Sequence, residues 1–454
     1  MTIRRNLGLA AALLAVSLTA AGCIHVPNPF KSKGGDHGDG KHHKYTGKGE
    51  RIPLAEFEQK LTPSEALKGQ DFYLPPPAPI ADWPLPGGTP EQSVEHVDAG
   101  KSFDIAWRTG FGRASSRAWH VTAPPIAADG KVFVMDGGAE VSAHDAGSGR
   151  DIWRTNVAVM TRRDREGFGG GIAYDAGKLF VTTGFRAVVA LDAATGKVLW
   201  RRPVDAPIHA APTVSGGRVF VESTDDNFMT FDEATGAPGW TYQAIAEPAR
   251  ILEATSPAVS GDAVVASFAS GELVALQADN GNTLWTAVLS KSNRNSALSE
   301  IRDIPGRPVV YKGDVFAVSH SGVFSSIELR TGNEHWNLPV TSVSSPWPVG
   351  DVVYVSDTAG EIICVSRDNG QVYWVTDMNK NVKKRKLRAL WSGPILASNR
   401  LVIVSDKGEI AALNPKTGAV EKTIKTGQDA LMTPIAAGPY LYVATEAAEL
   451  IAIR

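Results

Sequence analysis

A short sequence signal recurs seven times in this 454-residue chain. Each copy has an apolar run ending in Asp or a substitute, a Gly four residues later, and usually a Trp four residues after the Gly. Successive Gly positions lie 38 to 51 residues apart, and a strand-rich repeat of about this length is typical of a β-propeller blade. The copies are Asp145-Gly149-Trp153, Asp192-Gly196-Trp200, Asp232-Gly236-Trp240, Gln277-Gly281-Trp285, Glu328-Gly332-Trp336, Ser366-Gly370-Trp374 and Asn414-Gly418-Lys422.

Each copy is predicted to contain about four β-strands. Residues 178–182 and 188–192 are apolar and rich in β-branched side chains on either side of Gly184, which predicts an antiparallel hairpin. Thr195-Gly196 then supplies a turn in which positive φ costs little, and residues 198–201 begin another strand. The fold class is therefore all-β, with four-stranded antiparallel blades.

The two ends of the repeat region predict the number of blades. Residues 441–444 and 449–453 repeat the first two strand signals of a copy, whereas residues 104–108 carry a Trp-bearing strand with no hairpin before it. A propeller must pair its last blade with its first or leave an open sheet edge. We therefore predict an eight-bladed β-propeller closed by an N-terminal strand. The 348 residues from Trp107 to Arg454 then give 43.5 residues per blade.

The repeated Trp and Asp residues allow a functional and a structural interpretation. The Trp side chains could form an aromatic binding surface, but a large ring at one register in nearly every copy is what packing between blades requires. The Asp side chains are predicted to accept hydrogen bonds from backbone N–H groups in their own turns. No catalytic residue is assigned to either set.

The N-terminus predicts export and lipid attachment. Arg4-Arg5 precedes a short Leu- and Ala-rich stretch and then Ala20-Ala21-Gly22-Cys23. Residues 1–22 are therefore predicted to be a signal peptide, too short for a stable membrane span. Cys23 resembles the modified cysteine of bacterial lipoproteins, and the alternative is ordinary signal cleavage. By resemblance to lipoprotein sorting, Ile24 favours the cell outer membrane, with the protein facing the periplasm.

Residues 23–100 are predicted to form a flexible tether followed by a Pro-rich arm, ahead of a propeller at residues 101–454. Residues 31–50 consist mainly of Gly, Lys and His, a composition that cannot bury enough apolar surface to fold. His37, His42 and His43 could suggest a metal site, but they lack Cys or clustered carboxylates, so no metal ligand is assigned. Residues 52–68 are predicted to be one short helix. Residues 74–88 are expected to be extended, with Trp83 docked on the propeller.

The remaining composition contributes less. The formal net charge is −2, which implies no general attraction to nucleic acid. Cys364 takes the small-residue position of the sixth copy and is predicted to be buried rather than nucleophilic. Two basic runs lie between copies, at residues 162–165 and at residues 383–388. They are either solvated loops or contacts for acidic partner surfaces or anionic lipid head groups.

Taken together, the lipoprotein signal, the tether and the Trp-marked blades resemble the BamB family, the lipoprotein propellers of the outer-membrane β-barrel assembly machinery. The resemblance extends from Cys23 and the Trp107 strand to residues 449–454, and the Pro-rich arm resembles that of α-proteobacterial members. The resemblance implies a non-enzymatic scaffold without a cofactor. Its expected partners are the periplasmic domains of the barrel-inserting subunit BamA and other subunits of the assembly complex.

The same resemblance implies where a partner would bind. In the family, two loops between blades contact BamA. One corresponds here to a loop that includes Arg250, Ile251 and Leu252, although the family's sequence pattern is not reproduced there. The other corresponds to residues 301–308, in which Asp303 matches the first of two family aspartates and Arg302 precedes it. The alternative for Asp303 is a residue that caps its own turn.

Two other functional classes have similar repeats. The quinoprotein dehydrogenases resemble this chain in blade number and bind pyrroloquinoline quinone and calcium. They are longer, however, and carry an adjacent Cys-Cys pair, which this sequence lacks. No cluster of Glu, Asn and Asp with calcium-ligand spacing stands out either. A generic periplasmic scaffold or sensor with the same fold is the third hypothesis.

Overall fold

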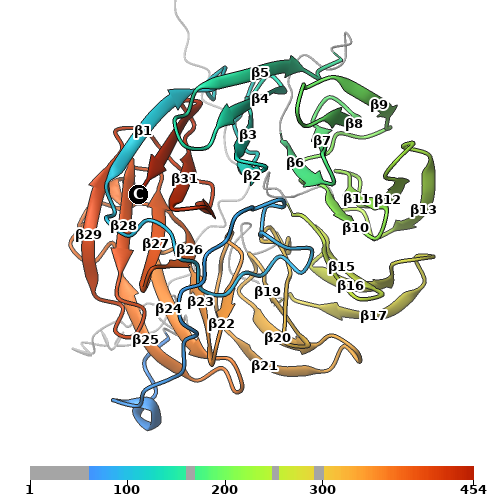
Figure 1. Cartoon of the computed structure of the whole chain (residues 1–454). Helices are drawn as coiled ribbons and strands as arrows, with labels where there is room; N and C mark the ends of the chain where they lie inside the picture. Colours follow the sequence, from blue (N-terminus) through green and yellow to red (C-terminus); the bar gives the residue numbers. More distant parts are fainter. Residues whose placement is uncertain (1–60, 160–168, 248–254, 291–300) are drawn as a thin grey trace, which may run out of the picture. The chain divides into compact units, whose positions relative to one another are not determined.

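The described part of the chain consists almost entirely of β-strands. A computed structural model describes residues 61–159, 169–247, 255–290 and 301–454. In these residues, strands β1 to β32 form eight four-stranded antiparallel sheets, arranged as blades around a ring (Figure 1). The predicted eight-bladed propeller is confirmed.

Seven blades are formed by four consecutive strands each. We number them from 1 to 7 along the chain, and within each blade the first strand is the innermost. Blades 1 to 3 consist of β2 (Ile126–Ala128), β3 (Lys131–Met135), β4 (Glu140–Asp145) and β5 (Asp151–Asn156); β6 (Gly170–Asp175), β7 (Lys178–Thr183), β8 (Ala187–Asp192) and β9 (Val198–Pro203); and β10 (Thr213–Ser215), β11 (Arg218–Glu222), β12 (Asn227–Asp232) and β13 (Pro238–Gln243).

The next four blades repeat this arrangement. Blades 4 and 5 consist of β14 (Ala258–Ser260), β15 (Ala263–Ser267), β16 (Glu272–Gln277) and β17 (Thr283–Val288), and of β18 (Val309–Tyr311), β19 (Asp314–Val318), β20 (Phe324–Glu328) and β21 (Glu334–Leu338). Blades 6 and 7 consist of β22 (Trp347–Val349), β23 (Val352–Ser356), β24 (Glu361–Ser366) and β25 (Val372–Asp377), and of β26 (Trp391–Ala397), β27 (Arg400–Ser405), β28 (Glu409–Leu413) and β29 (Val420–Lys425).

Blade 8 joins the two ends of the repeat region. It contains β30 (Ile435–Ala437), β31 (Tyr440–Ala444) and β32 (Glu449–Ile453), with β1 (Ile105–Gly110) as its outermost strand. The strands β1 and β32 are antiparallel, with Trp107 opposite Ala452. The N-terminal strand therefore closes the ring, as predicted.

Burial explains why the strands have the sequences they do. The second strand of a blade is covered on both faces by neighbouring blades, and β23 is buried at all five positions. Such strands are continuous apolar runs, because neither face meets water. The outermost strands β1 and β5 instead alternate between more and less exposed residues, as expected for a strand with one solvated face.

Each repeated Trp packs between two blades. The ring of Trp153 in blade 1 lies against Gly196 in the turn of blade 2, so close that a Cβ on Gly196 would be 2.4 Å from Trp153 Cε3. Trp153 Nε1 also donates to Ala193 O in that turn at 3.1 Å. Equivalent contacts of the other rings join Trp107 to Gly149, Trp200 to Gly236, Trp240 to Gly281, Trp285 to Gly332, Trp336 to Gly370 and Trp374 to Gly418. The predicted structural role is confirmed.

The repeated Asp residues cap their own turns, as predicted. Asp192 Oδ1 accepts hydrogen bonds from Thr195 N at 2.8 Å and Thr195 Oγ1 at 2.6 Å. These bonds stabilise the carboxylate and lower the pKa of Asp192. Asp232 makes the same pair of bonds with Thr235.

One junction lacks the Trp, and an ion pair occupies it. Lys422 of blade 7 stands where the Trp would be, and its Nζ lies 2.8 Å from Asp104 Oδ1 just before β1. Arg454 N donates to Asp104 O at 2.9 Å, so the two chain segments meet where other blades have a continuous turn. The closure is therefore held by backbone hydrogen bonds and charge in place of an indole ring.

The predicted helix is wrong for the part of residues 52–68 that the structure describes. Residues 61–68 contain only the short 3₁₀ helix η2 (Glu65–Leu67). Pro63 disfavours a helical residue before it, and Ser64 N donates to Val372 O of blade 6 at 2.8 Å. Among the described residues, no helix has the length and hydropathy to span a membrane.

Candidate functional site

The strand order gives the propeller two different faces. The turns between first and second strands, and between third and fourth strands, lie at one end of the blades. The turns between second and third strands, and the connections from one blade to the next, lie at the other end. We call these the turn face and the connection face. The predicted partner loop at residues 301–308 belongs to the connection face.

The N-terminal arm, residues 71–104, lies on the turn face and contacts all eight blades. It crosses the ring near its centre (Figure 1). At least one hydrogen bond joins the arm to each blade. In blade order from 1 to 8, the donor and acceptor atoms are Trp83 N and Ala127 O (2.6 Å), Tyr174 N and Pro84 O (2.8 Å), Gln92 Nε2 and Thr213 Oγ1 (3.1 Å), Val259 N and Pro90 O (2.7 Å), Val310 N and Glu91 O (2.9 Å), Asp351 N and Tyr73 O (3.1 Å), Val97 N and Leu396 O (3.1 Å), and Gly438 N and Ile80 O (2.8 Å).

Trp83 is the main apolar anchor of the arm. Its side chain is 1 % exposed and stacks on Trp347 of β22, with ring centroids 6.3 Å apart and an interplanar angle of 12°. Its backbone forms an antiparallel bridge with Ala127 of β2. The prediction that Trp83 docks on the propeller is confirmed.

Gln92 attaches the arm to the blades on the opposite side of the ring from its first contacts. It is buried and has a left-handed backbone, with φ of 61°. Its Nε2 donates to Thr213 Oγ1 and to Pro257 O, both at 3.1 Å, and its Oε1 accepts from Gly87 N at 2.9 Å. One amide side chain therefore joins the arm to blades 3 and 4.

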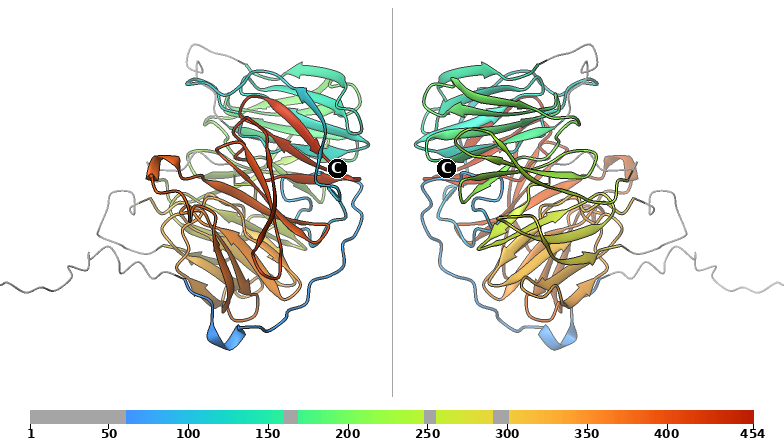
Figure 2. Two further views of the ribbon diagram at one scale, coloured as in Figure 1. Left: turned by 90° about the vertical axis from the view of Figure 1, so that its left-hand side faces the viewer. Right: turned by 90° about the vertical axis from the view of Figure 1, so that its right-hand side faces the viewer.

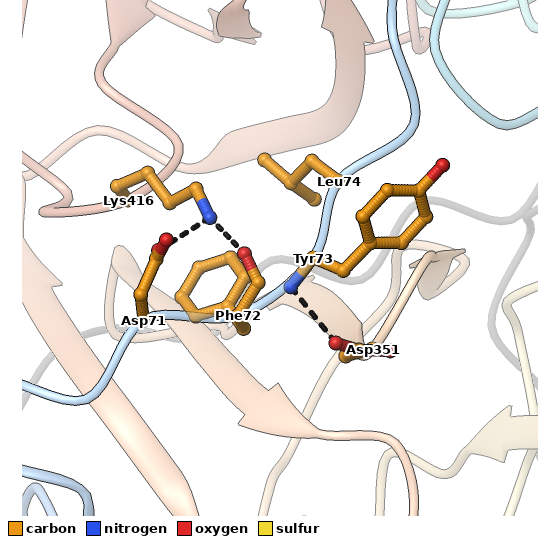
Figure 3. A pocket seen from close by; sticks show the side chains of 6 residues that line it. All are labelled: Asp71, Phe72, Tyr73, Leu74, Asp351 and Lys416. Carbon is orange, nitrogen blue, oxygen red and sulfur yellow. Dashed lines mark hydrogen bonds and ion pairs between the residues drawn. The ribbon is translucent and has the colours of Figure 1, made fainter.

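An open pocket of about 470 Å³ lies where the arm first reaches blades 6 and 7 (Figure 3). Lys416 Nζ donates to Asp71 Oδ1 at 2.6 Å and to Phe72 O, and it lies 4.3 Å from the centroid of the Phe72 ring. The hydrogen bond from Lys416 lowers the pKa of Asp71. Tyr73 N donates to Asp351 Oδ2 at 2.8 Å. These groups satisfy one another, so the pocket is a docking contact of the arm.

The connection face contains the predicted partner residues that the structure describes. Arg302 is exposed, whereas Asp303 is 6 % exposed and its carbonyl oxygen accepts from His320 N at 2.9 Å. Of this pair, only Arg302 therefore has a solvent-exposed side chain. Arg250, Ile251, Leu252 and the predicted lipidation residue Cys23 lie outside the described residues.

Two exposed apolar residues lie on the connection face and were not identified from the sequence. Ile245 follows β13 and is 62 % exposed, and Val288 ends β17 and is 63 % exposed. Both lie where the chain leaves an outermost strand toward the next blade. The sequence did contain a signal for them. Val288 lies in a predicted outermost strand and Ile245 just after another, and every second side chain of such a strand points to solvent.

The remaining candidates from the sequence are Cys364, the possible metal ligands and one of the basic runs. Cys364 is fully buried opposite Trp374, and burial raises the pKa of its thiol, so it is a packing residue, as predicted. In the described ranges, no cluster of three or more His, Cys, Asp or Glu is placed to hold a metal ion. His37, His42 and His43, and the basic run at residues 162–165, lie outside those ranges.

The fold and these surfaces define a β-propeller protein of the PQQ-like repeat class. The family model described as outer membrane protein assembly factor BamB matches residues 137–376, more than half of the chain. The chain therefore belongs to the BamB family, a family of non-enzymatic assembly factors.

Individual relatives agree with this family. The outer membrane protein assembly factor BamB of Burkholderia pseudomallei is 26% identical over 324 residues, which cover 71% of this chain and 81% of the relative. The crystal structure of BamB from Moraxella catarrhalis matches with a TM-score of 0.64 and 20% identity, covering 76% of this chain and 99% of that one.

A quinoprotein enzyme shares the fold alone. The quinohemoprotein alcohol dehydrogenase from Comamonas testosteroni matches with a TM-score of 0.64 but only 14% identity, covering 81% of this chain and 77% of that one. At this identity the likeness extends to the arrangement of blades, and it carries no argument about chemistry.

Proposed function

We propose that this chain is a scaffold subunit that assists the assembly of outer-membrane proteins. The observation that carries the proposal is the match of residues 137–376 to the BamB assembly-factor family. A rigid ring with variable loops on one face suits this role, because loops on a rigid scaffold can differ without disturbing the fold. The proposed site of action is the periplasmic surface of the outer membrane, with the chain held there by acyl groups on Cys23.

The proposed partner is the set of periplasmic domains of the barrel-inserting subunit BamA. The proposed contact surface is the connection face of blades 3 to 5. It includes exposed Arg302, exposed Ile245 and Val288, and the loop with Arg250, Ile251 and Leu252. Arg is enriched at protein interfaces, and exposed apolar side chains suit the buried core of an interface. Asp303 belongs to the same loop, where its burial suits it to shape the loop.

A pull-down with the charge of Arg302 reversed tests this surface. Arg302→Glu should lower the recovery of the barrel-inserting subunit from membranes by about tenfold, which corresponds to about 1.4 kcal/mol, because it replaces a contact cation with an anion. Arg302 is exposed, so the fold should be unaffected, and circular dichroism with thermal unfolding checks this. Asp303→Arg is a poorer test, since it would replace a buried carboxyl group with a larger cation and could disturb the fold.

Arg330→Glu is the matched control. Arg330 is 84 % exposed and lies in a turn of blade 5 on the turn face, so the same charge reversal there should leave recovery unchanged. Recovery that is equal for both variants and the unaltered protein would refute the proposed contact surface. Failure to recover the barrel-inserting subunit with the unaltered protein would refute the proposed partner.

A further inference from the structure

The connection between blades 6 and 7 carries a concentrated positive charge. We call residues 380–388 the basic loop. Within it, six cationic side chains are exposed to solvent: Lys380, Lys383, Lys384, Arg385, Lys386 and Arg388. Two carboxylates near its base make other contacts, since Asp377 Oδ1 accepts from Asn379 N at 2.8 Å and Asp406 pairs with Lys407 at 2.9 Å. Neither carboxylate pairs with a cation of the basic loop, so these cations are available to an external partner.

The basic loop is held in place at both ends. Asn379 is 3 % exposed, and its Nδ2 donates to Ala359 O and Ala389 O at 2.9 Å each, while its Oδ1 accepts from Ala389 N at 2.9 Å. Leu390 N donates to Asp406 Oδ1 at 2.8 Å. Because these bonds close the base, the cationic side chains are presented without a large ordering cost on binding.

A single exposed apolar side chain lies among the cations of the basic loop. Leu387 is 56 % exposed and ends the 3₁₀ helix η4 (Arg385–Leu387). In Figure 2, η4 lies on the side of the ring away from the arm. The apolar tip therefore lies on the connection face, with cationic residues before and after it in the sequence.

We propose that the basic loop binds the surface of an anionic phospholipid membrane. Lys and Arg side chains are attracted to lipid phosphates, and one apolar side chain among them suits the boundary between head groups and acyl chains. An acidic protein surface is the less favoured partner, because a protein interface has a broader apolar centre than one Leu provides. The proposal goes beyond the scaffold function, and it is consistent with the proposed anchor at Cys23 without depending on it.

Vesicle binding tests the proposal on the full-length chain, with Cys23→Ser in every sample to remove the acyl anchor. Leu387→Cys places one accessible thiol in the loop, since Cys364 is fully buried. An environment-sensitive fluorophore there should shift to the blue with vesicles of which half the lipid is phosphatidylglycerol, and not with phosphatidylcholine alone. High salt should abolish the shift. A fluorophore at Lys197→Cys, exposed on the turn face, should report water in both cases.

Co-sedimentation then measures the contribution of charge. The triple variant Lys384→Gln, Arg385→Gln, Lys386→Gln should bind anionic vesicles at least about tenfold more weakly, given the usual contribution of each basic residue at such a surface. The matched control removes three exposed cations from the turn face: Arg150, Lys197 and Arg330. It should bind as the parent does.

Three results would overturn the proposal. They are an unshifted fluorophore at Leu387→Cys with anionic vesicles, equal losses in the two triple variants, and loop-dependent binding of soluble polyglutamate without vesicle binding. The last result would assign the loop to an acidic protein. None of these results alters the pull-down with Arg302→Glu, so the two proposals fail independently.

Discussion

At the scale of single residues, the propeller depends on contacts that the repeated sequence signal encodes directly. The turn Gly is required twice over, because its φ is +71° at Gly196 and because the Trp of the preceding blade lies against it. The Asp before it supplies the turn cap. These positions were predictable because the same physical demand recurs in seven copies.

Comparing Gly196→Ala with a suitable control separates the stability lost at the contact with Trp153 from the stability lost through the positive φ. Gly196→Ala should lower the free energy of unfolding by roughly 1–2 kcal/mol for the left-handed backbone and by a further ~1–3 kcal/mol because its Cβ would overlap Trp153. Gly177→Ala is the control, since Gly177 also has a positive φ but nothing within 4 Å. Equal losses for the two variants in denaturant unfolding would show that the contact with Trp153 contributes nothing.

At the scale of elements, the arm is the feature that the sequence described least well. Trp83 was expected to dock, but its partners Ala127 and Trp347 could not be predicted, because the arm has no repeated pattern and its contacts are distant in sequence. Tyr73 and Asp351, for example, are separated by 278 positions. The burial of Asp303 was likewise hidden, since exposure within a loop depends on the blades around it.

His96 makes the attachment of the arm sensitive to pH. Its Nε2 accepts from Asn399 N at 2.9 Å, so the proton is on Nδ1, which donates to Pro75 O at 2.7 Å. Burial lowers the pKa of His96 below its ordinary value of 6.5, against the opposing effect of the Asp98 carboxylate. The unfolded chain therefore takes up this proton first, and this contribution to stability is lost as the pH falls from about 6.5 through the folded-state pKa.

His96→Gln should consequently reduce the acid sensitivity of the protein. The measurement is the free energy of unfolding in denaturant at a series of pH values between about 5 and 8. Buried His144 and half-buried His320, whose pKa values are also lowered by desolvation, remain in both proteins and cancel in the comparison. His335→Gln, at a side chain 43% exposed, is the control. An unchanged slope below about pH 6.5 for His96→Gln would contradict the prediction.

At the scale of the whole molecule, the two faces of the ring carry different features. The turn face is covered near its centre by the arm, whereas the connection face carries Arg302, Ile245, Val288 and the basic loop. The number of blades and their closure were predictable, because the strand signals at residues 104–108 and 441–453 complement each other. Which face the arm covers was not predictable, because the arm lacks the repeated sequence pattern.

The proposed anchor determines where the whole molecule resides. Cys23→Ser should abolish incorporation of radiolabelled fatty acid and release the protein from the outer-membrane fraction, because soluble contacts alone are weaker than multiple acyl chains. Cys364→Ser is the control, since Cys364 is buried in blade 6, and it should retain the label. Labelling that persists in Cys23→Ser would refute the anchor.

The contact of the arm with all eight blades also constrains the order of folding. A chain leaves the ribosome or a translocation channel with its N-terminus first, so the arm and β1 emerge before any blade exists. Their partners include Gly438 and Ile453, which emerge last. Contacts so distant in sequence form slowly. The arm and β1 therefore stay unpaired until the last residues have emerged. A chaperone that shields residues 71–110 would act on the longest-lived exposed intermediate.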